Sequence, residues 1–531
     1  MAPRTYASAL EHLSLLQSNH AITSLFAPSP PSPSAKPPTK EELNARAIPE
    51  MREWLARGGV SPADLARLRC VHVAGTKGKG SVCAYLTAIL TQPGAAAAGA
   101  GRVGTYTSPH LLSVRERIQL DGRPVGEDLF ARYFFETWDA FTAAAVRDSI
   151  TTTTNSKVLS DSDDADNLAG PATKPFYFRF LTIMALRVFL GEGVRSAVVE
   201  CGIGGEYDST NVLPAGAVTA AVVSQLGIDH VGMLGASLPE IAWHKAGVCR
   251  PGRRCFTRRL LDGDGEQTMR VLRRRAAEKR AELVELDDRA VEAWGGVPRR
   301  GTLEGAFQKY NQALAAVAAQ EHLRVLRQEE EGDGEEERGK GEEGEADRAG
   351  SLDSLPSFVL EGLARARLRG RCEVVRDGAV TWFVDGAHTG ESLAEAGAWF
   401  AGQAQGARRV VLVFNQQERD AAALLRRLHE SVGVSFGAAV FTRNDARARG
   451  PGEPPRDLAV QRACADAMAG LAPAAATTEV RVAESVPEAV ARVREMAARQ
   501  PGAEVGVLAT GSLHLVGALL RTLEGGGGLS R

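Results

Sequence analysis

A glycine-rich turn that carries lysines is the segment with the clearest chemistry. Residues 71–74 are a short apolar run, and the turn Gly75-Thr76-Lys77-Gly78-Lys79-Gly80-Ser81 follows directly. Main-chain N–H groups in such a turn, together with the N-terminus of a following helix, bind anions. Lys79 could then reach the outer phosphates of a nucleotide, and the Ser81 hydroxyl could face Mg²⁺. The turn therefore predicts a site for a nucleoside triphosphate.

This interpretation needs a strand before the turn and a helix after it, and the sequence offers both. Val82, Leu86 and Leu90 recur at helical spacing after the turn. The pattern G-T-K-G-K-G-S is shorter than G-x-x-x-x-G-K-[ST], because Val73 and Gly80 stand where that motif has glycine and a hydroxyl. A plain surface turn is the alternative.

Acidic and polar residues follow other apolar runs. Glu200 closes the run 197–199, where the carboxyl end of a parallel strand would place it among ligands, so it is the first Mg²⁺ candidate. Asp229 and His230 follow the run 222–226. The alternatives are a helix cap or surface carboxylate for Glu200 and a structural role for His230. Ser108 lies in a hydroxyl-rich loop that could also be an ordinary turn.

Three further positions could meet phosphates. Lys245 lies on a helical pattern and could neutralise charge, although a solvated lysine is the simpler interpretation. Asp385 ends the apolar run 382–384 in the same way as Glu200, and His388 follows it. Arg371 lies upstream and could contact phosphates across a cleft between domains.

The elements that must position these residues alternate between strand and helix patterns. Helices are expected over about 40–56 and 180–190, and strands over 197–201 and 217–224. A second alternating region has strand patterns at 382–384, 410–414, 438–441, 480–482 and 505–509. We therefore expect an α/β fold: an N-terminal P-loop-type ATPase domain with a mostly parallel sheet, and a smaller C-terminal, Rossmann-like α/β domain.

Composition fits a two-domain enzyme of 531 residues. The net charge of −2 gives no basic excess, so nucleic acid is not an expected partner. The seven cysteines include no C-x-x-C pair, which indicates reduced thiols in the cytoplasm. No apolar run is long enough to cross a bilayer, and a mitochondrial leader has little support.

Domain limits follow from changes in composition. We expect an ATP-binding domain over 1–327, an acidic low-complexity linker over 328–355 and a second domain over 356–531. Residues 28–38 are rich in proline and serine and indicate a loop. The polar stretch 148–174 and the Glu/Gly-rich stretch 328–350 are expected to be mobile.

Ten motifs, in order, resemble the folylpolyglutamate synthases, which belong to the Mur-ligase-like ATP-dependent amide ligases. The motifs are YASALEHLSLLQSN (6–19), GTKGKGS (75–81), GTYTSPHL (104–111), YFRFLTIMALRVF (177–189), ECGIGGEYDSTN (200–211), LGIDHVGMLG (226–235), IAWHKAG (241–247), DGAHT (385–389), FNQQERD (414–420) and TGSLHLVG (510–517). Residues 414–417 and 241–245 look most like the fungal enzymes. Leu368-Arg369 stands where the family usually has Trp-Pro.

The resemblance implies roles for individual residues. Ser108, Glu200 and His230 match the family's Mg²⁺ ligands, and Lys245 matches a lysine that is carbamylated in some relatives. Gln308 and Asn311 match residues that contact the nucleotide base. Arg371 and Asp385 match the family's ATP-binding residues of the second domain, and Lys79, Lys245 and His388 are the expected catalytic residues.

The same resemblance implies a reaction. ATP would phosphorylate the γ-carboxylate of a reduced folate, and the amine of L-glutamate would displace phosphate to leave a γ-linked amide. ATP, Mg²⁺ and a monovalent cation such as K⁺ are the implied cofactors, and a monomer is expected, with a mitochondrial pool possible beside the cytoplasmic one. The alternatives are a dihydrofolate synthase or bifunctional form, a peptidoglycan-type ligase, and a catalytically silent nucleotide-binding module.

Overall fold

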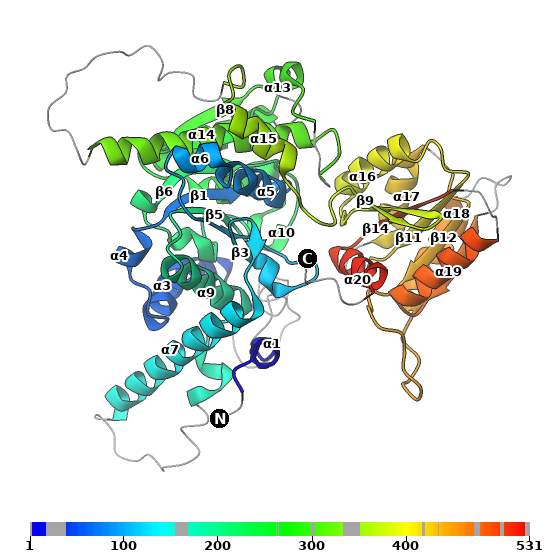
Figure 1. The fold of residues 1–531 in the computed structure, drawn as a ribbon, viewed down its shortest axis with the longest axis horizontal. Helices are drawn as coiled ribbons and strands as arrows, with labels where there is room; N and C mark the ends of the chain where they lie inside the picture. The colour runs from blue at the N-terminus through cyan, green and yellow to red at the C-terminus, as the bar shows by residue number, and fades with distance from the viewer. Residues whose placement is uncertain are drawn as a thin grey trace. The chain divides into compact units, whose positions relative to one another are not determined.

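The computed structural model describes residues 3–16, 39–153, 168–261, 263, 265–298, 303–332, 351–416, 420–433, 435–471, 478–499 and 504–525. They form two compact units (Figure 1). Unit 1 comprises Met1–His110, Arg115–Pro298 and Lys309–Arg365. Unit 2 comprises Leu111–Val114, Arg299–Gln308 and Ala366–Arg531.

Unit 1 is built on an eight-stranded sheet with the order β4-β3-β2-β5-β1-β6-β7-β8. Neighbouring strands pair in parallel from β2 through β5, β1, β6 and β7 to β8, whereas β3 pairs antiparallel with both β2 and β4. Nearly every residue of the central strands is buried, as expected for a parallel sheet that is covered on both faces. The strands are β1 (Arg69–Ala74), β2 (Val103–Tyr106), β3 (Ile118–Leu120), β4 (Arg123–Pro124), β5 (Ser196–Glu200), β6 (Val218–Val223), β7 (Arg254–Arg258) and β8 (Glu282–Leu286).

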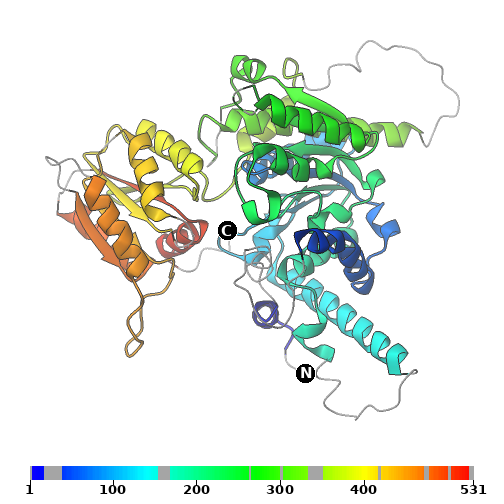
Figure 2. The ribbon, with the colours of Figure 1, turned by 180° about the vertical axis from the view of Figure 1, so that it is seen from behind.

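Helices pack around this sheet, which Figures 1 and 2 show from opposite sides. Several begin with a capping box. At α3 the Thr39 hydroxyl accepts the Glu42 main-chain N–H, and the Glu42 carboxylate accepts the Thr39 main-chain N–H; Ser237 and Glu240 do the same at α11. The helices are α1 (Tyr6–Ser14), α3 (Lys40–Arg57), α4 (Pro62–Leu65), α5 (Lys79–Leu90), α6 (Pro93–Ala97), α7 (Glu127–Thr153), α9 (Tyr177–Gly191), α10 (Val231–Leu234), α11 (Leu238–Lys245), α12 (Gly265–Glu278), α13 (Asp288–Trp294), α14 (Gln308–Gly332) and α15 (Ser357–Arg365).

Unit 2 is a six-stranded sheet between two helical layers. Its order is β13-β12-β11-β14-β10-β9, and among the strands that the structure describes here only the edge strand β9 is antiparallel. One core packs α19 and α20 on the sheet, and the other packs α16, α17 and α18 on the opposite face. The elements are β9 (Glu373–Asp377), β10 (Val380–Val384), α16 (Gly390–Gln403), β11 (Arg409–Phe414), α17 (Ala421–Val432), β12 (Ala438–Thr442), α18 (Ala459–Leu471), β13 (Glu479–Ala483), α19 (Val486–Ala498), β14 (Val505–Thr510) and α20 (Leu513–Leu523).

The predicted fold class is confirmed: both units are α/β, with mostly parallel sheets. The helices expected over 40–56 and 180–190 are α3 and α9, and the five strands expected in the second region are β10 to β14. The sequence analysis did not identify β2, β3, β4, β7, β8 and β9. Most of these are short or mixed-polarity strands whose pattern is weak.

The limits of the units differ from the expected ones: unit 2 also contains Leu111–Val114 and Arg299–Gln308, and unit 1 continues to Arg365. Helix α15 belongs to unit 1, where Gly362 packs so closely on α5 that an added Cβ would lie 2.5 Å from the Ile89 Cα. Helix α7 continues to Thr153 and α14 continues to Gly332, so each of the two stretches expected to be mobile begins as helix. At the end of the first stretch, the Lys174 ammonium group is 2.8 Å from the Thr173 hydroxyl and stacks on Trp138. Residues 154–167, 333–350 and 28–38 lie outside the described residues.

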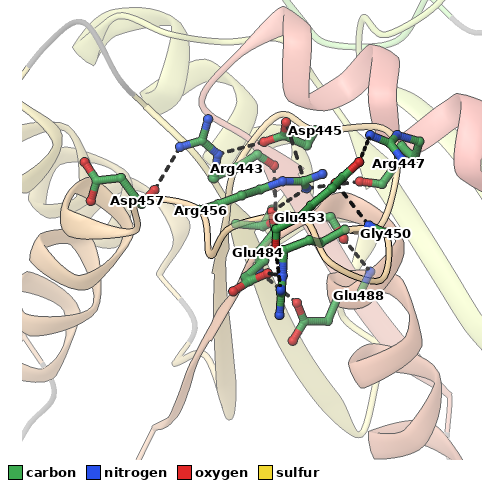
Figure 3. Close-up of polar contacts among 12 residues, drawn as sticks. Arg443, Asp445, Arg447, Gly450, Glu453, Arg456, Asp457, Glu484 and Glu488 are labelled. Carbon is green, nitrogen blue, oxygen red and sulfur yellow. Dashed lines mark hydrogen bonds and ion pairs between the residues drawn. The ribbon is translucent and has the colours of Figure 1, made fainter.

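The loop between β12 and α18 is held by a network of charged side chains (Figure 3). Arg456 is the centre of this network, with a side chain that is only 14% exposed. Its guanidinium donates to the main-chain carbonyls of Arg447 and Glu484, each at 3.0 Å. Arg447 in turn pairs with Glu453 at 2.6 Å. The network fixes a long loop that has no helix or strand of its own.

Among the described helices, none is both long enough and apolar enough to cross a membrane. All seven cysteines are buried free thiols.

Candidate functional site

The glycine turn lies between β1 and α5, as the sequence predicts. Gly75 and Gly78 have φ angles of +145° and +82°, a backbone conformation that side chains resist. Gly78 is also the N-cap of α5 and has no side chain with which to cap it. The N-terminus of α5 therefore carries backbone donors without a side-chain cap, which is the arrangement that binds anions.

The segment that follows β6 holds the turn in place. The main-chain N–H groups of Thr76 and Lys77 both donate to the carbonyl of Gln225, at 2.9 and 3.1 Å. The Ser224 hydroxyl donates to the Lys77 carbonyl at 2.7 Å. The Thr76 hydroxyl donates to the Gly227 carbonyl at 3.0 Å. These bonds pre-organise the turn, so a ligand would not have to order it.

Lys245 approaches the turn from α11. Its ammonium group donates to the Gly75 carbonyl at 2.7 Å, and the residue is only 3% exposed. Burial, and then the positive charge of Lys79, lower the pKa of Lys245 to about 7. Near neutral pH Lys245 therefore populates the neutral amine form, which an ordinary lysine hardly populates.

Two buried carboxylates lie close to the turn. Glu200, at the end of β5, is 4% exposed and accepts the main-chain N–H of Ser108 at 2.9 Å. Asp208 accepts the main-chain N–H of Ile203 at 2.8 Å and the Thr210 hydroxyl at 2.6 Å. Burial raises the pKa of Asp208, and the charge of Lys79 acts in the opposite direction. Lys79 thus lies within electrostatic reach of Asp208 and Lys245.

His230 is less closely held than the other expected metal ligands. It has a φ of +50° and precedes α10, and its side chain is 46% exposed. Asp229 contributes to the electrostatics of Lys245, which places this loop near the same cluster. In the described ranges no group of three His, Cys, Asp or Glu side chains is arranged to hold a metal alone. The structure thus brings Ser108 and Glu200 together without showing that His230 joins them.

The first turn of α14 carries the two residues expected at the nucleotide base. Gln308 is fully buried, and Asn311 is 5% exposed. The Asn311 amide packs against Gly78: a Cβ on Gly78 would overlap the amide oxygen and lie 3.2 Å from the Asn311 Cγ. Asn311 and the glycine turn are therefore neighbours in space, although 233 positions separate Gly78 and Asn311 in the sequence.

In unit 2, Arg371, Asp385 and His388 also lie together. The Asp385 carboxylate accepts the main-chain N–H groups of Cys372 and Ala387, each at 2.8 Å. The Arg371 Nη1 atom lies 3.2 Å from the place where a Cβ on Gly386 would be. The His388 Nδ1 atom is 2.9 Å from the Gly386 carbonyl oxygen. Arg371 thus lies beside Gly386, the residue that follows Asp385, despite the missing Trp-Pro.

Sequence reasoning missed two residues that hold the turn, and a third, Asp208, that lies within electrostatic reach of Lys79. Ser224 and Gln225 hold it through a hydroxyl and a carbonyl, and nothing in their residue types announces that role. Asp208 did carry a signal, because it is an acid within the glycine-rich stretch that follows Glu200.

A comparison with known proteins gives a consistent result. Residues 370–513 match the family described as Mur ligase, glutamate ligase domain. The folylpolyglutamate synthase of Neurospora crassa is 36% identical over 98% of this chain and 92% of its own length. That of Saccharomyces cerevisiae is 37% identical over 84% of this chain and 72% of its own length.

Solved structures show the same fold. The Mycobacterium tuberculosis folylpolyglutamate synthase complexed with ADP has a TM-score of 0.65 and 24% identity, and the match covers 99% of each chain. A second M. tuberculosis structure, complexed with ADP and AMPPCP, has a TM-score of 0.60 and 25% identity over 92% of this chain and 99% of its own. Escherichia coli FolC in complex with DHPP and ADP has a TM-score of 0.57 and 21% identity, and the match covers 92% of this chain and 99% of its own.

Proposed function

Because the chain belongs to the folylpolyglutamate synthase family, we propose that residues 75–81 bind the phosphates of ATP and that Lys79 neutralises the outer phosphates. The observation that carries this proposal is the pre-organised turn between β1 and α5, with buried Glu200 and Lys245 beside it. Gln308 and Asn311 contact the base, and Arg371 and Asp385 contribute from unit 2.

The reaction is the ATP-dependent addition of L-glutamate to a folate. The γ-carboxylate oxygen of the folate attacks the terminal phosphorus of ATP, which releases ADP and leaves an acyl phosphate. The amine of L-glutamate then attacks the acyl carbon, loses a proton, and displaces phosphate to form a γ-linked amide. Such phosphoryl transfer depends mainly on positioning and charge neutralisation, which lysines and backbone N–H groups supply. His388 is proposed to act on the transferring or leaving phosphate.

The residues beside the turn fit Mg²⁺. This ion prefers oxygen ligands, keeps several waters, and is usually held by one or two carboxylates together with substrate phosphates. Glu200 offers a buried carboxylate, and Ser108 offers a hydroxyl on the residue whose main chain already bonds to it. We assign Ser108 and Glu200 as ligands, with His230 as the third. Bound Mg²⁺ would neutralise charge on the β- and γ-phosphates, and K⁺ is proposed as an additional activator.

Lys245 has a second proposed role. A neutral amine reacts with CO₂ to give a carbamate, and the lowered pKa of Lys245 supplies that neutral form near pH 7. Carbamylation would turn a buried cation into an anion beside the turn. In that state the side chain could bind the metal ion rather than the Gly75 carbonyl.

Incubation with ATP, Mg²⁺, K⁺, L-glutamate and tetrahydrofolate tests the function. Mass spectrometry should show successive glutamyl additions, and the Lys79→Ala variant should show none. Turnover of that variant near the wild-type rate would contradict the phosphate role of Lys79. A parallel incubation with dihydropteroate separates a dihydrofolate synthase from the main proposal, because only that activity consumes dihydropteroate.

We also propose that the protein is a cytoplasmic monomer with a possible mitochondrial pool. The buried free thiols support a reducing compartment. Cell fractionation and analytical ultracentrifugation test these two points.

A further inference from the structure

A short segment just before α14 is fastened to unit 2. Leu303 is fully buried, and Phe307 packs against the core formed by α16, α17 and α18. Between them, one carboxylate oxygen of Glu304 accepts two hydrogen bonds, from the Trp399 indole N–H at 3.0 Å and from the Gln403 amide at 3.2 Å. Both donors lie on α16, so Glu304 ties residues 303–307 to that helix.

The donor that Glu304 meets is itself fixed. Trp399 is only 8% exposed, and its ring packs edge-on against Phe383 with the centroids 5.7 Å apart. Gly305, at φ +99°, makes the turn that brings the Phe307 ring back onto unit 2; a Cβ there would lie 2.6 Å from that ring. Beside this segment an open cavity of about 420 Å³ is lined by Glu304, Phe307, Trp399 and Glu395.

The same segment leads directly into the nucleotide-binding residues. The chain leaves unit 2 and enters unit 1 between Gln308 and Lys309. Gln308 is four positions after Glu304, and Asn311 follows within the first turn of α14, against Gly78. No glycine or proline separates Phe307 from Asn311, so the path of the segment and the start of the helix are mechanically linked.

We propose that Glu304 is a positioning residue for the nucleotide: through Trp399 and Gln403 it fixes residues 303–307, the segment that leads into Gln308 and Asn311, which are proposed to meet the base. The inference rests on the proposed function, because it assumes that these two residues bind ATP. It gives Glu304 an effect on nucleotide affinity although it is not itself proposed to touch the nucleotide.

Calorimetric titration of the full-length protein with ADP tests the inference. Glu304→Ala should weaken ADP binding about tenfold, because displacement of Gln308 and Asn311 would remove about one hydrogen bond to the base. Steady-state kinetics should show the same rise in the KM for ATP, with the KM values for folate and glutamate within twofold of wild type. Glu304→Gln keeps an oxygen acceptor for the indole and should stay within about threefold of wild type.

Glu395→Ala is the matched control, because Glu395 lines the same cavity and α16 carries it, yet it is exposed. It removes the same charge and should leave ADP affinity unchanged. Trp399→Phe keeps the packed ring, loses the indole N–H, and should weaken ADP binding in the same direction. The double variant with Glu304→Ala should be less than additive.

The outcomes separate this inference from the proposed function. ADP affinity of Glu304→Ala equal to that of Glu395→Ala, or full additivity with Trp399→Phe, would overturn the positioning role while wild-type ADP binding stands. A wild-type protein that does not bind ADP would overturn the nucleotide site and this inference with it. A thermal unfolding scan of each variant confirms that folded protein is compared, and Trp399→Phe carries the test if Glu304→Ala does not fold.

Discussion

Replacing Gly78 by alanine should lower both the stability of the protein and its affinity for the nucleotide, through two separate effects. The φ of +82° costs an alanine about 1–2 kcal/mol, which is a penalty paid by the backbone alone. The added Cβ would also overlap the Asn311 amide oxygen. Asn311 is 5% exposed, so its amide can escape only by rotating away from the place where it is proposed to meet the base.

The expected loss follows from these two parts. Displacing the Asn311 amide removes about one hydrogen bond to the base, which corresponds to a Kd for ADP about tenfold weaker, or about 1.4 kcal/mol. The KM for ATP in the ligation assay should rise by a similar factor. The backbone penalty should appear separately, as a lower midpoint of thermal unfolding.

Gly193→Ala is the matched control for the backbone penalty. Gly193 has a φ of +68°, and nothing lies within 4 Å of an added Cβ. Gly193→Ala should therefore show the backbone loss of stability alone, while only Gly78→Ala should lose affinity for ADP. An ADP Kd for Gly78→Ala within twofold of that for Gly193→Ala would refute the placement of Asn311 against the nucleotide turn.

Three further predictions concern buried side chains that can carry a charge. Lys245→Met should lower the ligation rate by roughly 100-fold and abolish the ¹³C-carbamate NMR signal that wild type shows under labelled CO₂, and in wild type both the rate and the signal should fall from pH 8 to 6 as the amine is protonated. A signal unchanged in the variant would exclude a carbamate at this lysine. Burial lowers the pKa of His72 and His322 to about 3, so their neutral rings contribute fully to stability above about pH 6.5, and this contribution falls by about 1.4 kcal/mol per pH unit for each ring toward pH 3. The free energy of unfolding of His322→Gln, measured by urea titration, should therefore fall less steeply with decreasing pH than that of wild type, and an identical slope would contradict the lowered pKa of His322. Arg456→Ala leaves two main-chain carbonyls without a donor and should cost about 1–3 kcal/mol in thermal unfolding, whereas the exposed Arg427→Ala should cost under about 0.5, and equal losses would show that the loop network is not stabilising.

The elements that form the site were largely predictable from the sequence. The apolar run before Gly75 and the helical spacing after it predicted the β1–turn–α5 unit. Glu200 and Asp385 were predicted in the same way, because each carboxylate directly follows a buried run, and the carboxyl ends of parallel strands are where ligands bind in α/β sheets. The roles of Gln308 and Asn311 could be inferred only from a family resemblance.

What the sequence could not give is contact between distant segments. Ser224 holds the turn through a hydroxyl whose partner is 147 positions away. Burial and the charge of Lys79 lower the pKa of Lys245, and the helical spacing around Lys245 in the sequence predicts neither its burial nor the proximity of Lys79. Helix α15 was assigned to the second domain because a helical period does not say which unit a helix packs on.

The claim at the centre of this account is that ATP activates the folate γ-carboxylate. The direct test is to supply a folate labelled with ¹⁸O in that carboxylate, together with ATP and L-glutamate, and to analyse the released phosphate by mass spectrometry. One labelled oxygen should pass from the carboxylate to phosphate as the amine displaces it, with wild-type protein and not with Lys79→Ala. Unlabelled phosphate, formed while glutamate is being added, would contradict the acyl-phosphate route.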